Sequence, residues 1–168
     1  MQGSRSRRIR QSWGQIMSIR RIYVAEDKAE LVRSLRSAEN PTAPFQTFAD
    51  VMTFAAVLGA KRGKKMPLGK TSRKEPDPIP QDQFVARGYE PVINLIAIAH
   101  TKDPKSLALD EESGNIRVQI FEEYANGGLE VLQNTLQGSV DYTDGILLLL
   151  LDEKDRGDQE DFDLSRFL

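Results

Sequence analysis

Few residues in this chain have the types and spacing that acid–base or metal chemistry requires. The 168 residues include a single histidine, His100, and no cysteine, which excludes disulfides, thiolate ligands and metal sites built from several histidines. Hydrolysis would need a nucleophile beside a base, or two converging carboxylates. Glu122 and Glu123 are consecutive, so on a helix their side chains point about 100° apart and do not converge. We therefore predict no catalytic residue, no metal site and no cofactor.

Two further features invite a chemical interpretation and do not support one. Gly69-Lys70-Thr71 resembles the end of a nucleotide-binding phosphate loop, but that motif needs a glycine where Lys64 stands, and no strand precedes it. His100 ends a strongly apolar segment, which favours a structural role over proton transfer. The incomplete motif at Gly69-Lys70-Thr71 therefore argues against nucleotide hydrolysis. It favours a basic loop that contacts phosphate oxygens without reading a base sequence.

Charge is distributed very unevenly along the chain. Residues 1–75 carry 16 Lys and Arg against 6 Asp and Glu, whereas residues 76–168 carry 7 against 19. This asymmetry indicates two faces with different partners, and nucleic acid is the natural partner of the basic half. Alternatively, the halves neutralise each other within the fold or between subunits, which makes a homo-oligomer possible. The candidate DNA-backbone contacts are Arg20, Arg21, Lys61, Arg62, Lys64, Lys65, Arg73 and Lys74. Replacing Lys61, Arg62, Lys64 and Lys65 together is expected to leave the fold unchanged.

Apolar periodicity predicts a mainly α fold that positions these charges. We expect a compact helical domain of about five helices with a short N-terminal strand near residues 19–24, a basic central loop and a disordered acidic C-terminal tail. Residues 1–18 are predicted to be a flexible basic extension, with Met17 as a possible alternative start. Residues 19–152 form the helical domain, and residues 153–168 form the acidic tail.

Local signals refine three of the expected helices. Thr47 and Asp50 have the spacing of a capping box at a helix start. The segment 89–100 is apolar nearly all round, which predicts a central helix covered on every side. Gly127-Gly128 interrupts the helix expected at 115–136, which indicates a kink or a close approach by another backbone.

The chain shows no sign of secretion or membrane insertion. Its basic start lacks the apolar core of a secretory signal. The longest strongly apolar run, Ile146 to Leu151, has six residues, far fewer than the ~20 that span a bilayer. The absence of cysteine also suits a reducing compartment, so we expect a cytoplasmic protein that does not contact membranes.

Four segments of this chain stand in a distinctive order and spacing. They are RIYVAEDKAELVRSL, FQTFADVMTFAAVLGAKRGKKMPL, VINLIAIAHTKD and IFEEYANGGLEVL. Together they resemble one known family, DNA phosphorothioation-associated protein 4, also called dnd system-associated protein 4. The resemblance covers about Ile19 to Leu151, its most specific part is FEEYANGGLE, residues 121–130, and residues before Ile19 lie outside the shared pattern.

The resemblance implies a genomic setting. Such systems replace a non-bridging phosphate oxygen of DNA with sulfur, and associated proteins support modification or restriction of unmodified DNA. The leading hypothesis is an accessory, non-catalytic factor of a bacterial phage-defence system of this kind, whose basic half contacts the DNA backbone. Other system proteins would bind through Glu122, Glu123, Tyr124 and Asn126.

Two alternatives remain open. One is a protein–protein adaptor in the same system that never touches DNA. The other is a ribbon-helix-helix regulator, in which residues 19–24 pair with a second copy across a dimer and one strand face reads the major groove.

Overall fold

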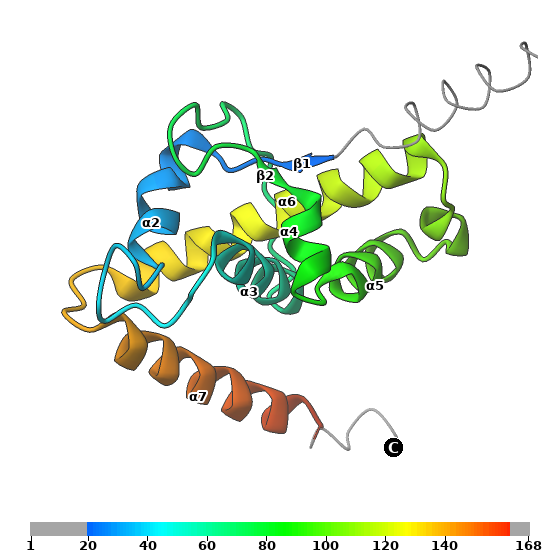
Figure 1. Ribbon diagram of the computed structural model, residues 1–168. Coiled ribbons are helices and arrows are strands. Elements are labelled where there is room, and N and C mark those ends of the chain that lie inside the picture. The colour runs from blue at the N-terminus through cyan, green and yellow to red at the C-terminus, as the bar shows by residue number, and fades with distance from the viewer. Residues whose placement is uncertain (1–19, 162–168) are drawn as a thin grey trace, which may run out of the picture.

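One long helix, α6 (Glu111–Leu136), runs through the middle of the molecule in the computed structural model (Figure 1). The structure describes residues 20–161, with side chains described to residue 157. The predicted fold class, mainly α with a short N-terminal strand, is confirmed. The elements are β1 (Arg21–Ile22), η1 (Glu26–Lys28), α2 (Ala29–Ser34), α3 (Phe48–Lys61), β2 (Ile79–Pro80), α4 (Gln81–Ala86), α5 (Glu90–Thr101), η2 (Pro104–Leu107), α6 and α7 (Tyr142–Asp161).

The tightest contact in the fold joins α3 to α6, and glycines make it possible. A Cβ atom built on Gly128 would lie 1.8 Å from the carbonyl oxygen of Ala55, and one on Gly59 would lie 2.0 Å from that of Tyr124. On Gly127 it would lie 1.9 Å from the carbonyl oxygen of Lys64. The predicted close approach by another backbone is therefore confirmed, but α6 continues through both glycines without the predicted interruption.

The predicted capping box at the start of α3 is confirmed. The Asp50 amide donates to Thr47 Oγ1 at 3.2 Å, and the Thr47 amide donates to Asp50 Oδ2 at 2.9 Å. Asp50 also accepts hydrogen bonds from Arg87 and from Tyr89 Oη. Burial would raise the pKa of Asp50, but the hydrogen bonds from Tyr89, Thr47 and Arg87 outweigh it and lower the pKa. The cap therefore also ties α3 to the turn before α5.

Two predictions for residues 81–100 need correction. Helix α5 is not covered on every side, because it packs against α6 and α3 on one face only: Ile93 and Ile96 are buried, whereas Leu95 is 65% exposed. Helix α4 was not predicted at all. Its six residues are too few to show periodicity, yet Phe84 is fully buried and meets the Phe121 ring edge-on at 5.6 Å.

The predicted boundary between the last helix and an acidic tail is also wrong. Helix α7 continues to Asp161, because Glu153 is buried against two cations of α3 and Asp152 pairs with Arg156 one turn later at 2.9 Å. The predicted extension, residues 1–18, and residues 162–168 of the predicted tail lie outside the described residues. Among the helices described, none has the length and apolarity needed to cross a membrane.

The small sheet excludes the ribbon-helix-helix geometry. Strand β1 pairs antiparallel with β2 of the same chain, with Ile22 opposite Ile79. In a ribbon-helix-helix dimer that pairing would be made with a second copy. The strand instead fastens the N-terminal segment to the region before α4, and the Arg20 carbonyl extends the contact by accepting from the Gln81 amide at 2.8 Å.

Candidate nucleic-acid interface

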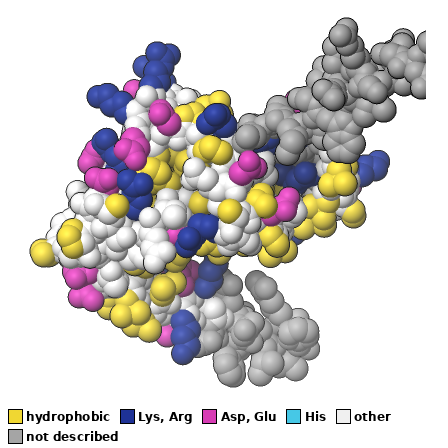
Figure 2. Space-filling view, in the orientation of Figure 1, with side chains coloured by type: hydrophobic (Ala, Val, Ile, Leu, Met, Phe, Trp, Pro, Cys, Tyr) yellow, Lys and Arg dark blue, Asp and Glu magenta, His cyan; other side chains and the backbone are white. Residues whose placement is uncertain are grey.

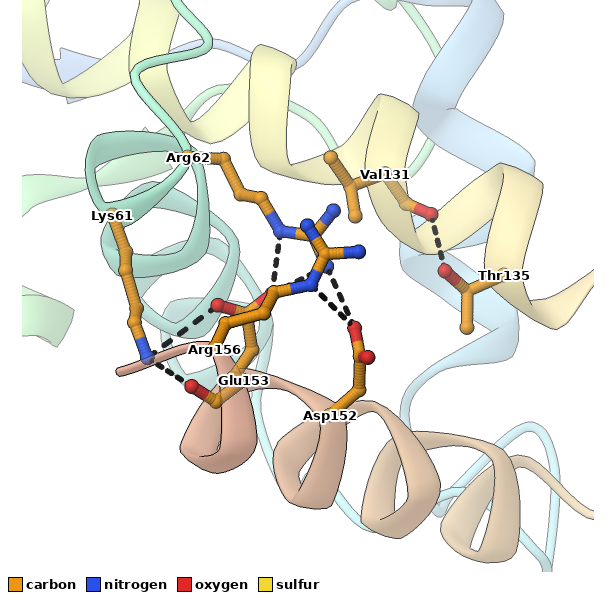
Figure 3. A network of polar contacts seen from close by, with 7 residues as sticks. All are labelled: Lys61, Arg62, Val131, Thr135, Asp152, Glu153 and Arg156. Atoms are coloured by element: carbon orange, nitrogen blue, oxygen red, sulfur yellow. Dashed lines mark hydrogen bonds and ion pairs between the residues drawn. The ribbon is translucent and has the colours of Figure 1, made fainter. Parts of the chain in front are cut away.

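Two of the predicted DNA contacts, Lys61 and Arg62, hold α7 against α3 (Figure 3). Lys61 Nζ donates to the Glu153 carbonyl oxygen at 2.9 Å and lies 3.4 Å from its carboxylate. The Arg62 guanidinium binds the same carboxylate and lies 3.5 Å from Asp152. The Glu153 side chain is only 8% exposed. Both cations are thus engaged in ion pairs within the fold, and removing both would leave a carboxylate buried without a partner.

Lys65 belongs to a cluster that joins the end of α5 to α6. Its ammonium lies 2.8 Å from the Glu123 carboxylate and 3.4 Å from His100 Nε2, while Tyr124 Oη lies 3.0 Å from His100 Nδ1. Lysine only donates hydrogen bonds, so Nε2 is the acceptor in the contact with Lys65. His100 thus links Lys65 to Tyr124 of α6 through its two ring nitrogens.

The predicted partner-binding residues lie where α6 meets β1 and residues 66–67. The Glu122 carboxylate accepts from the Tyr23 amide at 2.7 Å, and the Glu123 carbonyl oxygen accepts from the Met66 amide at 3.0 Å. Asn126 Nδ2 donates to the Pro67 carbonyl oxygen at 2.9 Å. This contact set gives FEEYANGGLE an internal role: its polar side chains fasten two distant segments to one helix.

Glu122 makes the stability of the protein depend on pH. Burial, together with the charge of Glu123, raises the pKa of Glu122 from 4.5 to about 7 against the opposing hydrogen bond from Tyr23. Between these two values the folded state binds more protons than the unfolded state, so stability falls as pH rises. We expect Glu122→Gln to gain about 3 kcal/mol relative to the wild type between pH 4.5 and pH 8, measured as the free energy of unfolding in urea. If the free energies of unfolding of the two proteins changed with pH in the same way, this expectation would be contradicted.

Arg20 and Arg21 contact neutral oxygen atoms instead of carboxylates. Arg20 donates to Asn115 Oδ1 at 3.2 Å and to the Glu111 carbonyl oxygen at 3.3 Å, and Arg21 donates to the Pro78 carbonyl oxygen at 3.3 Å. These bonds orient the guanidinium groups but do not neutralise them. Both arginines remain able to contact an anion from a fixed position.

The remaining predicted contacts, Lys64, Arg73 and Lys74, together with Lys70, form what we call the basic segment. None of the four makes an ion pair with a described residue. Lys70, Arg73 and Lys74 are exposed, and Lys64 is half-buried. Lys70 lies within the predicted basic loop but was not among the individual contacts predicted from the sequence. No helix follows Thr71, so the phosphate-loop geometry is absent from this part of the described chain.

The basic segment is ordered by its backbone. The Glu26 amide donates to the Lys70 carbonyl oxygen and the Ser72 amide donates to the Val24 carbonyl oxygen, both at 2.8 Å. Beside these bonds lies an open depression of about 540 Å³ lined by Glu26, Gly69, Lys70, Thr71 and Arg73. The predicted basic central loop is thus fastened to residues 24–26, just after β1, and Lys70, Arg73 and Lys74 are exposed on it.

A further cation of the basic half, Lys28, is buried and was not recognised from the sequence. It is 3% exposed and its ammonium lies 2.6 Å from Asp27 and 2.8 Å from Glu130. Burial opposes its charge, but the hydrogen bonds to both carboxylates outweigh burial and raise the pKa of Lys28. Its charge is compensated locally, so Lys28 adds nothing to the surface available to nucleic acid.

The comparisons with known proteins identify the family. A family model described as DNA sulphur modification system-associated protein 4 matches residues 21–167. No curated protein and no solved structure matches the chain. The match begins at β1, so the residues before Ile19 lie outside the shared pattern, and it extends past the expected end at Leu151. The chain belongs to the family of DNA sulphur modification system-associated protein 4.

Proposed function

We propose that this protein is an accessory, non-catalytic factor of a DNA sulphur modification and restriction system, and that the basic segment contacts the DNA backbone. Its family membership associates it with a DNA sulphur modification system. The observation that carries the proposal is the charge balance of the surface. Lys61, Arg62 and Lys65 are paired with carboxylates, whereas the basic segment has no ion-pair partner among the described residues. Unpaired cations on a fixed, exposed segment attract phosphate oxygens.

The expected contact is with phosphates and not with base edges. Side chains that read bases usually project from a helix or a strand ribbon that enters a groove. The basic segment belongs to neither kind of element. Four neutralised phosphates give a slope of log affinity against log salt of about −3.6 on duplex DNA. Binding should therefore weaken steeply with salt and be indifferent to base sequence.

Neutralising Lys70 and Arg73 tests the proposal. We expect the double variant Lys70→Gln and Arg73→Gln to reduce the slope from about −3.6 to about −1.8, because two of four counterion-releasing contacts disappear. Fluorescence anisotropy of a labelled duplex over a salt series measures it. The matched control replaces Lys102 and Lys105, two exposed cations after α5, with glutamine and should keep the original slope. Equal slopes for the two double variants would refute the assignment of the DNA contact.

An adaptor function is the second candidate, favoured by exposed apolar side chains at the end of the molecule formed by α5, η2 and the start of α6. Leu95 is 65% exposed and Leu109 is 98% exposed, and Leu107 and Ile116 are exposed nearby in sequence. Apolar groups of this size are common at sites that bind other proteins. No DNA binding even at low salt, with tight binding to another protein of the system, would favour the adaptor.

A further inference from the structure

The outer side of α7 carries an apolar stripe that the described chain leaves uncovered. Ile146, Leu149 and Glu153 face the body of the protein and are buried. At 100° per residue the opposite side of the helix presents Leu147, Leu148 and Leu151, which are 54%, 67% and 52% exposed. Figure 2 shows hydrophobic side chains gathered over this part of the surface.

The size of the stripe calls for a partner. Three half-exposed leucines on one helix face leave on the order of 300 Å² of apolar surface in water, about as much as the largest patch on a typical monomer. Apolar stripes at this spacing on a helix pack against the same kind of stripe on a second helix. The stripe therefore fits a second helix of similar length, on which the charged residues at the two ends stand in the reverse order.

The charges at the two ends of the stripe specify that helix. Asp144 precedes the leucines and Lys154 follows them, five residues on either side of Leu149. Both are exposed, and neither forms an ion pair with a described side chain. A parallel copy would place Asp144 opposite itself. An antiparallel copy centred on residue 149 places Asp144 opposite Lys154 at both ends, with Leu147 opposite Leu151.

We propose that α7 is a dimer interface, in which two copies of this chain pack their outer leucine stripes antiparallel about a two-fold axis. Such an interface is isologous and closes on itself. With about 300 Å² of apolar surface per copy, its area falls below that of standard specific interfaces, so the dimer should be weak. The dimer should therefore exchange with monomer at micromolar concentration, and its population should rise with protein concentration.

The test is the mass in solution of the full chain, by sedimentation velocity between about 1 and 200 μM. The wild type should shift from 18.9 kDa to twice that mass. Leu148→Glu should remain monomeric throughout. At 1 μM, where the wild type is also monomeric, the two melting curves should coincide because residue 148 lies outside the core. The control Leu95→Glu alters a leucine on α5 that is 65% exposed, nearly the same as Leu148, and should dimerise like the wild type.

A charge exchange tests the antiparallel register. Lys154→Asp alone should weaken the dimer about tenfold, since the two-fold axis breaks two ion pairs at once. The double variant Asp144→Lys with Lys154→Asp should recover the wild-type affinity. A wild type that stays monomeric at the highest concentration overturns the proposal, and dimerisation only after removal of residues 162–168 would identify that segment as the occupant. A double variant no tighter than the single one overturns the register.

Discussion

Alanine at Gly128 should lower the free energy of unfolding by about 3–5 kcal/mol, even though alanine favours a helix over glycine by about 1 kcal/mol. The added Cβ would sit 1.8 Å from the Ala55 carbonyl oxygen. That atom belongs to the backbone of α3, so relief requires the two helices to separate. Overpacking against flexible side chains destabilises a protein by about 1–3 kcal/mol. A clash with a backbone atom should destabilise it by more, because the backbone cannot move aside as a side chain can.

The control for this variant is Gly157→Ala in α7. No heavy atom lies within 4 Å of a Cβ built at that position, so only helix propensity should act and stability should rise by up to about 1 kcal/mol. Urea denaturation measures both variants against the wild type. A Gly128→Ala protein as stable as the wild type would mean that α3 and α6 do not approach each other so closely.

Aspartate at Ile96 should be at least as damaging as alanine at Gly128. Ile96 is 6% exposed on the face of α5 that packs against α6. A carboxylate there would lie among apolar side chains without a partner, which costs several kcal/mol or forces the group to take up a proton. We expect a loss of more than about 4 kcal/mol in stability, or a chain that does not fold.

The adjacent residue supplies the control. Leu95 is 65% exposed on the same helix, so Leu95→Asp should stay within about 1 kcal/mol of the wild type, mostly from the lower helix propensity of aspartate. Thermal melting followed by circular dichroism separates the two variants. Similar melting temperatures for both would show that the buried face of α5 has been assigned wrongly.

Features encoded by neighbouring residues were predictable from the sequence. The capping box needs only Thr47 and Asp50 three residues apart, and both of its hydrogen bonds are present. The consecutive glycines in α6 signalled a backbone contact because few other roles justify their cost inside a helix. The apolar segments of α3, α5 and α6 marked the helices that share the core, although not which face of α5 stays in water.

Features that depend on distant residues were not predictable. Glu153 belongs to a run of acidic residues whose composition is typical of a solvated tail, and its partners lie more than 90 residues earlier in the chain. For the basic loop, the sequence shows which cations are present but not which of them are already paired. Only the fold shows that Lys61, Arg62 and Lys65 are paired. The candidate interface therefore shrinks to the basic segment and the two arginines of the β1 region.

The glycine contact between α3 and α6 also shapes how this chain must fold. About 65 residues separate Gly59 from Tyr124. Closing a loop of that length costs roughly 4 kcal/mol of free energy, because the chain loses conformational entropy before the helices pack. During synthesis at ~5–20 residues per second, α3 waits roughly 3–13 s for its partner. Its apolar face, with Val51, Met52 and Ala55, meanwhile faces water. The nascent chain therefore passes through an interval in which the apolar face of α3 is open to chaperones or to misassembly with other chains.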